Sequence, residues 1–442
     1  MELNKNSVTV RSPINIALIK YWGKLARNLN IPLNCSLSLT LDRKTIYSET
    51  KMEMIEGEKD EFFLYNKKGE LIDTKMPKNY HILKNFFKNY YKEKSGCDTF
   101  SVRITSRNSF PTQAGMASSA SGISCIALCF CRLFNFFEED CTEVKQDIIN
   151  NIKEWHLTDN KKKIERVFAI SLLLRITSAS SARSIFPFFV LQYGIDLNKK
   201  VLEQSKEEFD IEGFNKLINW EHDECQVSAA ILLNKYFHKE STMFPYFDKI
   251  SKRFPHIGYA DMNKDDLSNF CLSFPITTTQ LHTRDSFIKF FSQFQLLIVT
   301  LHKEKKKVTS TNGMMDTGLT SKGILFRVEN VKKDLRGLFE SVDKSDSEQF
   351  LELISRESNN FHSVCLDTYP PLFYMRERSF DVVNAICEFN KERGKTVVGY
   401  TFDAGPNPFI FINKDSFDDF MTVLLEKVKI NADDIIKADF NV

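Results

Sequence analysis

Small residues and hydroxyls dominate residues 111–122, which read Pro-Thr-Gln-Ala-Gly-Met-Ala-Ser-Ser-Ala-Ser-Gly and lead directly into an apolar run. This order is typical of a tight loop followed by the first turn of a buried helix. Such a turn presents unpaired backbone N–H groups and the positive end of the helix dipole, which together favour an anion. The segment lacks the Gly-Lys-[Ser/Thr] ending of a Walker A loop. It predicts either a phosphate-binding loop, with serine hydroxyls for phosphate or Mg²⁺, or an ordinary capped helix packed through small residues.

A carboxylate at the end of a strand is the second candidate for chemistry. Residues 397–402 have the composition of a strand, and Asp403-Ala404-Gly405-Pro406 follows. A rigid strand would fix the carboxylate of Asp403, and Gly405 would let a substrate approach it. An aspartate that only stabilises a turn would give the same pattern, so both interpretations stay open.

Basic side chains could supply the opposite charge at two places. Lys20 and Lys24 flank Tyr-Trp-Gly, which fits a carboxylate or phosphate pocket with aromatic walls, or a strand end whose lysines reach into solvent. Arg183 lies in a second hydroxyl-rich stretch, 177–184. That stretch is either a helix start that holds an anion, with Arg183 as a two-pronged donor, or a small-residue helix packed closely on a neighbour.

The elements that must position these residues follow from hydrophobic periodicity. An amphipathic helix is predicted over 78–95, with its lysines in solvent and Lys84 as the exception that could face inward. The lysine-rich run 303–307 is interpreted as a solvated loop, and 309–315 as a hydroxyl-rich turn. Strands are predicted within 7–19, 36–66, 100–105, 291–301, 397–402 and 409–412, and helices after the opening loop to about 137, over 321–358 and over 380–390.

Length and composition exclude several classes of protein. A chain of 442 residues is long enough for two or three domains, and its 42% hydrophobic and 27% charged content is ordinary for a globular protein. A net charge of +2 gives no general attraction to nucleic acid or membrane. The ten cysteines show no C-x-x-C or zinc spacing, and no ligand spacing is present among His222, His238, His256 and His282. With no signal peptide or convincing transmembrane segment, we expect a cytoplasmic protein in a reducing compartment.

Several of these motifs, in this order, resemble the mevalonate diphosphate decarboxylase family of the GHMP kinase superfamily. Tyr-Trp-Gly-Lys at 21–24 and Phe-Asp-Ala-Gly-Pro-Asn at 402–407 are far more specific to the decarboxylases than the serine loop is. The other matching segments are Ile14–Ala17, Pro32–Ser38, Asn108–Ser119, Ser180–Ser184 and Cys365–Pro371. The resemblance is weak over 138–170 and 195–285, which look like expansions.

The resemblance implies an α+β, GHMP kinase-like two-domain fold with the active site in the cleft between the domains. The domains would be residues 1–195, which bind the nucleotide, and residues 196–442, which are ferredoxin-like with an expanded region near 196–285. The implied partners are a small-molecule substrate and a second copy in a homodimer, although the sequence alone does not fix the oligomeric state. No nucleic acid or membrane partner is implied.

The implied reaction is ATP- and Mg²⁺-dependent decarboxylation of mevalonate 5-diphosphate to isopentenyl diphosphate, through phosphorylation of the tertiary hydroxyl. Asp403 would act as base or orienting group, Lys20 would lie beside it, and Arg183 would hold the carboxylate. Further substrate-binding residues by resemblance are Tyr21, Trp22, Gly23, Lys24, Lys84, Ser178 and Ser180. The ATP-binding residues by resemblance are Asn108, Pro111, Gly115, Ala117, Ser118, Ser119 and Ser121, with Ser118 also on Mg²⁺.

The chain departs from the family around Arg183. The family carries Gly-Ser-Gly-Ser-Ala-Cys-Arg there, whereas this chain reads Thr-Ser-Ala-Ser-Ser-Ala-Arg, and Pro187-Phe188 replaces a Gly-Gly pair. Two alternatives therefore stay open. One is a related GHMP kinase that phosphorylates mevalonate or mevalonate phosphate without releasing CO₂. The other is a degenerate, non-catalytic member of the family, against which the retained Lys20, Arg183 and Asp403 argue.

Overall fold

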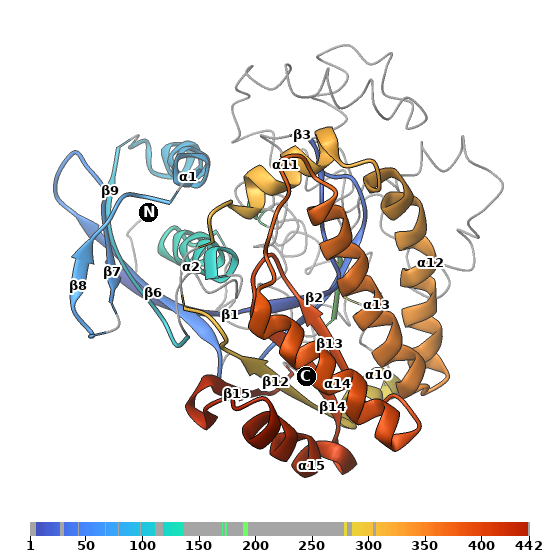
Figure 1. Ribbon diagram of the computed structural model, residues 1–442. Helices are drawn as coiled ribbons and strands as arrows, with labels where there is room; N and C mark the ends of the chain where they lie inside the picture. The colour runs from blue at the N-terminus through green and yellow to red at the C-terminus, as the bar shows by residue number, and fades with distance from the viewer. Residues whose placement is uncertain are drawn as a thin grey trace.

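The chain folds into a mixed α+β protein with its helices packed on three main sheets (Figure 1). The structure is a computed structural model, and it describes residues 6–26, 31–42, 44–66, 68–77, 79–97, 99–110, 118–136, 170, 173–174, 189–192, 278–280, 285–303 and 306–440. The α+β class predicted from the sequence is confirmed.

The first sheet lies in the N-terminal part of the chain, in the order β1-β6-β9-β7-β8. Its strands are β1 (Ser7–Pro13), β6 (Tyr47–Ile55), β9 (Ser101–Asn108), β7 (Glu61–Tyr65) and β8 (Leu71–Asp73). Buried and exposed residues alternate along β1, because one face of the sheet meets the core and the other meets solvent. Neighbouring strands are antiparallel, except that β7 and β9 run parallel.

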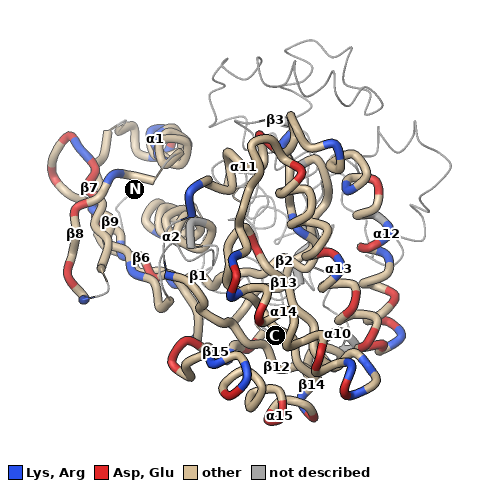
Figure 2. The backbone as a smooth tube through the Cα atoms, in the orientation of Figure 1, with Lys and Arg blue, Asp and Glu red and all other residues tan. Residues whose placement is uncertain are grey.

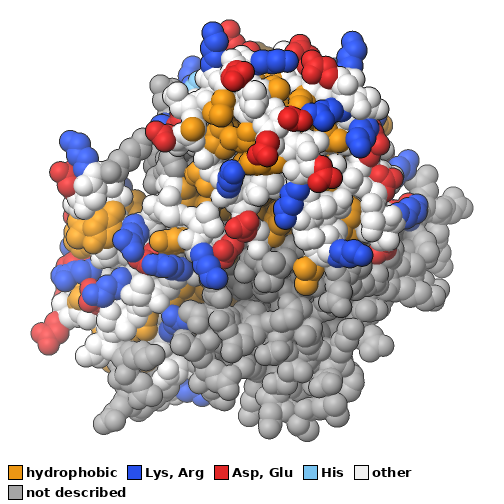
Figure 3. Space-filling model, turned by 90° about the horizontal axis from the view of Figure 1, so that it is seen from below, with side chains coloured by type: hydrophobic (Ala, Val, Ile, Leu, Met, Phe, Trp, Pro, Cys, Tyr) orange, Lys and Arg blue, Asp and Glu red, His pale blue; other side chains and the backbone are white. Residues whose placement is uncertain are grey.

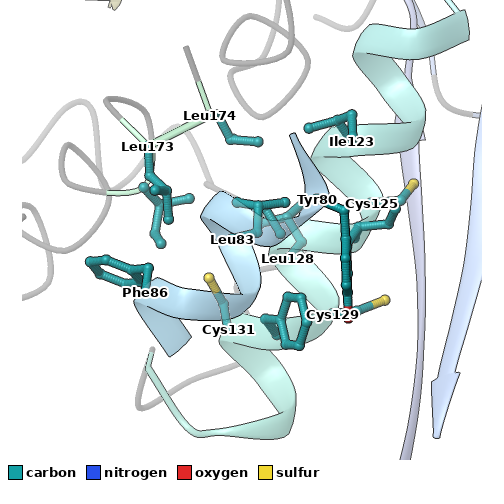
Figure 4. Packing of buried hydrophobic residues seen from close by; sticks show 14 of the residues in the cluster. Tyr80, Leu83, Phe86, Ile123, Cys125, Leu128, Cys129, Cys131, Leu173 and Leu174 are labelled. Atoms are coloured by element: carbon teal, nitrogen blue, oxygen red, sulfur yellow. The ribbon is translucent and has the colours of Figure 1, made fainter. Parts of the chain in front are cut away.

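Two helices, α1 (Tyr80–Ser95) and α2 (Ser118–Leu133), pack together, and α2 packs on β1 and β6. Figure 4 shows buried aromatic, aliphatic and cysteine side chains of the hydrophobic cluster to which both helices contribute. The Sγ atoms of Cys125 and Cys129 donate to the backbone oxygens of Ser48 and Thr50 on β6, at 3.0 and 3.4 Å. Burial raises the pKa of Cys125 to about 12. The helix predicted after the serine loop is confirmed from Ser118 onward.

The second sheet has the order β11-β10-β5-β2. Its strands are β2 (Asn15–Ile19), β5 (Ser36–Thr40), β10 (Phe189–Gln192) and β11 (Thr278–Gln280), and β3 (Lys24–Ala26) pairs separately with β4 (Ile31–Pro32). Strand β11 lies in the second predicted domain, yet it pairs with β10 of the first. The division into 1–195 and 196–442 stays a prediction.

The third sheet has the order β13-β14-β12-β15 and is antiparallel throughout. Its strands are β12 (Phe294–Val299), β13 (Val398–Phe402), β14 (Pro408–Asn413) and β15 (Ile435–Ala438). The helices of this part are α10 (Asp285–Ser292), α11 (Ser310–Thr320), α12 (Ile324–Asp343), α13 (Ser347–Leu366), α14 (Glu377–Arg393) and α15 (Phe417–Thr422). Helices α12 and α13 lie side by side, and α13 packs on β13 (Figure 1).

One hydrophobic core joins the second and third sheets. It contains Ile16 and Leu18 of β2 together with Ile298 of β12, Phe411 of β14 and Ile354 of α13, all fully buried. Because a core of this kind is packed as densely as a crystal, it fixes the two sheets relative to each other. The ends of β2 and β13 are therefore held at a defined separation.

Two local predictions were wrong. Residues 309–315 are not a turn but the start of α11, because the Thr309 side chain accepts a hydrogen bond from the Asn312 N–H and so caps a helix. Phe291 belongs to α10, and the buried strand begins only at Phe294. Hydroxyl residues occur in both turns and helix starts, and aromatic residues occur in both strands and helices, so the local sequence does not decide between them. Tertiary packing decides which element forms.

Gly399 on β13 should not tolerate a larger side chain. A Cβ there would lie 2.8 Å from the Leu351 backbone oxygen of α13, and backbone cannot move as a flexible side chain can. We expect Gly399→Ala to lower the free energy of unfolding by about 1–3 kcal/mol. Urea unfolding followed by circular dichroism measures this.

The matched control is Gly122→Ala on α2, where a Cβ would meet nothing within 4 Å. Alanine favours a helix over glycine, so we expect the control to gain about 0.5–1 kcal/mol. Equal unfolding free energies for Gly399→Ala and the parent would contradict the close contact between α13 and β13.

Candidate active site

Two charged residues that are far apart in the sequence meet where β2 and β13 end. Lys20 follows the last residue of β2, and Asp403 follows the last residue of β13. The Lys20 Nζ lies 2.7 Å from the Asp403 Oδ1, with the lysine side chain 3% exposed and the aspartate side chain 23% exposed. The ammonium is therefore enclosed by protein, while part of the carboxylate stays exposed.

The pairing of β2 with β5 shifts its register just before Lys20. Ala17 pairs with Ser38 and Ile19 with Leu37, so Leu18 is an extra residue in β2. A bulge bends a strand and re-aims the residues that follow it. Lys20 Nζ also donates to the Ala17 backbone oxygen at 2.7 Å, which folds the side chain back along its own strand.

The turn after β13 is fastened to the loop after β12. The Asn407 side chain accepts from the backbone N–H groups of Leu301 and His302, at 2.7 and 3.0 Å, and donates to the His302 oxygen at 3.1 Å. The Gly405 N–H donates to the backbone carbonyl oxygen of Asp403 at 2.6 Å, which tightens the turn. The Gly-Pro-Asn segment thus holds the Asp403 backbone in place.

Lys306 is a third charged residue at this site, and sequence reasoning missed it. Its Nζ donates to the Ala404 oxygen at 3.0 Å and to the Ser310 Oγ at 2.7 Å. Burial lowers the pKa of Lys306, and the charge of Asp403 acts in the opposite direction. The solvated-loop prediction for 303–307 was wrong at this residue. The available signal was its position just before a hydroxyl-rich helix start, but neighbouring lysines gave the same pattern.

Aromatic packing anchors the segment after Lys20. Trp22 Nε1 donates to Thr317 Oγ1 on α11 at 3.0 Å, and its ring meets those of Phe361 and Tyr374 edge-on. Gly23 has φ +82°, a conformation that side chains disfavour, and a Cβ there would lie 2.6 Å from Leu33 Cδ1. Tyr21 and Lys24 are buried beside them. These four predicted substrate-binding residues lie next to Lys20 along the chain.

Other predicted site residues lie in different networks. Lys84 Nζ binds the Asp60 Oδ1 and the Phe100 oxygen, both at 2.7 Å, and stands over the Phe100 ring. The Ser48 hydroxyl joins two predicted ATP-binding residues, at 2.6 Å from Asn108 Oδ1 and 2.6 Å from Ser121 Oγ. Ser118 and Ser119 begin α2, but their side chains lie outside the described residues, as do Pro111, Gly115, Ala117, Ser178, Ser180 and Arg183.

The charges around Asp403 differ from those of the protein surface. Over the described part of the face in Figure 3, acidic and basic side chains are interspersed, and the same mixture runs along the backbone in Figure 2. At the site, two lysines approach one carboxylate. The described residues hold no group of three or more His, Cys, Asp or Glu side chains that could bind a metal, and no helix among them is long and apolar enough to cross a membrane.

Two family models match the chain on either side of its middle. One is described as the mevalonate 5-diphosphate decarboxylase C-terminal domain and matches residues 296–440. The other is described as the diphosphomevalonate decarboxylase-like N-terminal domain and matches residues 12–150. The chain belongs to the mevalonate diphosphate decarboxylase family. Lys20 lies in the range that matches the N-terminal domain, and Asp403 lies in the range that matches the C-terminal domain. The candidate site therefore contains residues from both matched ranges.

Relatives in this family match over most of their length. The diphosphomevalonate decarboxylase of Rattus norvegicus is 26% identical over 426 residues, covering 94% of this chain and 79% of the rat protein. The solved structure of mevalonate diphosphate decarboxylase from Trypanosoma brucei matches with a TM-score of 0.62 and 24% sequence identity. The match covers 95% of this chain and 83% of the Trypanosoma brucei chain. A structure described as MDDEF in complex with MVAPP, AMPPCP and magnesium has a TM-score of 0.61 and 22% sequence identity, and the match covers 98% of this chain and 97% of the MDDEF chain. The chain shares the fold of these family members.

His362 on α13 is a buried titratable group that the sequence gave no reason to select. Burial, and then the charge of Lys20, lower its pKa to about 3. Its Nε2 has no hydrogen-bond partner among the described residues. His362 is therefore neutral at physiological pH, and its imidazole adds no further positive charge beside Lys20.

Replacing His362 should make the protein less sensitive to acid. The folded state protonates this group near pH 3 and the unfolded chain near pH 6.5, so between these values the unfolded state binds more protons. The free energy of unfolding then falls as the pH falls. Between pH 7 and pH 4.5, we expect the parent to lose about 2–3 kcal/mol more than His362→Gln. Urea unfolding at the two pH values measures the difference.

The control is His81→Gln, which removes an exposed imidazole on α1. Its loss of stability between pH 7 and pH 4.5 should match that of the parent. The same loss in His362→Gln as in the parent would contradict a buried, neutral His362.

Proposed function

We propose that this chain catalyses the ATP-dependent decarboxylation of mevalonate 5-diphosphate to isopentenyl diphosphate. The observation that carries the proposal is the 2.7 Å pair between Lys20 and Asp403, which joins two family motifs at one point. Membership of the family and the named activity of its relatives support the same reaction. MVAPP, AMPPCP and magnesium in the MDDEF complex support ATP and Mg²⁺ as the co-substrate and metal.

The reaction needs a better leaving group than hydroxide. Asp403 Oδ2 or Oδ1 would accept the proton of the substrate's tertiary hydroxyl, or orient that hydroxyl. The hydroxyl oxygen would form a bond to the γ-phosphorus of ATP, and ADP would leave with the electron pair of the broken P–O bond. The new phosphate then leaves with the electron pair of its C–O bond. The C–C bond to the carboxylate breaks, CO₂ departs, and the electron pair of that bond forms the double bond of the product.

Electrostatic stabilisation is the main contribution that the described residues can make. Lys20 and Lys306 place two ammonium groups around Asp403, and the site therefore suits a phosphate that gains charge during transfer. Because Lys20 is held by two hydrogen bonds in a buried place, its charge does not have to reorganise during the reaction. Positioning and fixed charge are what phosphoryl transfer requires of a protein.

The substrate and nucleotide groups would be held by the residues that the family resemblance implies. Arg183 would bind the substrate carboxylate, and Tyr21 with Lys24 would bind its diphosphate. The serine loop would hold the phosphates of ATP, with Ser118 on Mg²⁺, and the magnesium would screen phosphate charge when bound. We also propose a homodimer and a cytoplasmic location; the described cysteines are all free thiols, which suits a reducing compartment.

Incubation with ATP, Mg²⁺ and mevalonate 5-diphosphate, with CO₂ and ADP followed together, tests the proposal. We expect one CO₂ for each ADP. ADP without CO₂ would support the related-kinase alternative, and neither product would support the degenerate, non-catalytic alternative. A parallel incubation with mevalonate phosphate shows whether the diphosphate is required.

Asp403→Asn should lose most of its turnover. The amide oxygen can still accept a hydrogen bond from Lys20, so we expect a folded protein, but it cannot accept the substrate proton. The rate of CO₂ release should fall by about 10²–10⁴-fold. Asp418→Asn, at an exposed position on α15, is the control and should keep the parent rate. Near-normal turnover in Asp403→Asn would contradict its assignment.

A further inference from the structure

The backbone of Lys20 is held by two charged side chains from different helices. The Lys20 N–H donates to Glu357 Oε1 of α13 at 2.9 Å. The Lys20 oxygen accepts from a terminal nitrogen of Arg327 on α12, also at 2.9 Å. Arg327 and Glu357 form an ion pair with each other, and both side chains are only 1% exposed. One buried pair therefore binds both polar groups of the Lys20 backbone.

Lys20 needs these partners because it lies beyond the sheet. The last residue of β2 paired with β5 is Ile19, so the regular backbone ladder ends one residue earlier. Asn34 Nδ2 also donates to the Lys20 oxygen, at 3.0 Å. A backbone group buried without a partner loses its hydrogen bonds to water and gains none in return, which destabilises the fold. Side chains thus take the place of a neighbouring strand at the residue whose ammonium meets Asp403.

The same helix that carries Glu357 also holds the strand that leads to Asp403. Ser355 Oγ accepts from the Tyr400 N–H at 3.0 Å, and Ser358 Oγ accepts from the Phe402 N–H at 2.9 Å. Strand β13 is an edge strand, and these α13 serines bind N–H groups on its open edge. Glu357 lies between the two serines in the sequence. Helix α13 therefore contacts the backbone on both sides of the pair formed by Lys20 and Asp403.

The ion pair is a poor device for stability alone. Arg327 Nε and Glu357 Oε2 have no hydrogen-bond partner among the described residues, although Arg327 also donates to Asn360 Oδ1 at 2.7 Å. Taking two charges out of water is costly, and well-packed apolar residues often replace such a pair without loss of stability. The main effect of this ion pair is therefore on the position of Lys20 rather than on the stability of the fold.

We infer that Arg327 and Glu357 are positioning residues that set the distance between the Lys20 ammonium and Asp403 in the reaction proposed above. This inference rests on that proposed function for its kinetic consequence. Neither residue has to touch substrate, because both act through the Lys20 backbone. A displacement of about 1 Å can cost an enzyme on the order of 10²-fold in rate.

Two variants separate positioning from stability. Arg327→Met with Glu357→Leu removes both charges and both contacts to Lys20, but keeps similar volumes. Glu357→Gln keeps an oxygen that accepts from the Lys20 N–H, but removes the carboxylate that forms the ion pair with Arg327. Ile354→Val, a buried substitution on the same helix, is the control for ordinary loss of packing.

We expect the double variant to be the more stable of the two variants but the slower enzyme. The double variant should unfold at a temperature close to that of Ile354→Val, yet lose on the order of 10²-fold in kcat with KM changed by less than about threefold. Glu357→Gln should unfold at a lower temperature, yet keep kcat within about tenfold of the parent. A double variant that keeps the parent kcat, or that does not fold, would overturn the inference. A kcat that simply follows the unfolding temperature would also overturn it.

Hydrogen exchange of the Lys20 amide provides a readout that does not depend on activity. In the parent this amide is bonded to buried Glu357, so it should exchange slowly. In the double variant its exchange should be faster by at least about tenfold, whereas Glu357→Gln and Ile354→Val should resemble the parent. If the parent releases no CO₂, the proposed reaction fails, and this pattern of exchange still decides whether the pair holds Lys20. Unchanged exchange in the double variant would contradict that contact.

Discussion

The contact between Lys20 and Asp403 is the interaction on which the rest of the site depends. It joins the ends of β2 and β13, and it brings a motif near residue 20 to a motif near residue 403. The distance between the two side chains depends on how precisely the surrounding strands and helices are positioned. The shared core between the second and third sheets, the bulge in β2 and the side chains of α13 all act on the same separation. The fold is organised to keep one ammonium and one carboxylate together.

Charge at the site is arranged locally rather than by the protein as a whole. The net charge of the chain is close to zero, and opposite charges are mixed over the face that Figure 3 shows. Around Asp403, by contrast, Lys20 and Lys306 approach from two different loops, and the neighbouring His362 is kept neutral by burial. An enclosed site strengthens each of these charges because little water is present to screen them. This arrangement suits a substrate that carries phosphate and carboxylate groups.

The sequence predicted the α+β class, most elements and the family, because strong periodicity and specific motifs are local properties. It predicted that Lys20 and Asp403 would be neighbours only through the resemblance, since no local pattern reports a contact between residues so far apart. It missed Lys306, because five charged residues in a row look alike until packing buries one. It also missed Arg327, Glu357 and His362, whose roles come from burial on α12 and α13. Arg183 and residues 111–117 of the serine loop lie outside the described residues, so their roles remain predictions.

A double-mutant cycle on Lys20 and Asp403 tests the central claim most directly. The parent, Lys20→Met, Asp403→Asn and the double variant would be compared by kcat/KM for CO₂ release from mevalonate 5-diphosphate. If the two side chains act as one unit, the double variant should be little worse than the more damaged single variant, which corresponds to a coupling energy of about 2–3 kcal/mol. Losses that simply multiply, or a single variant that keeps the parent kcat/KM, would contradict the account.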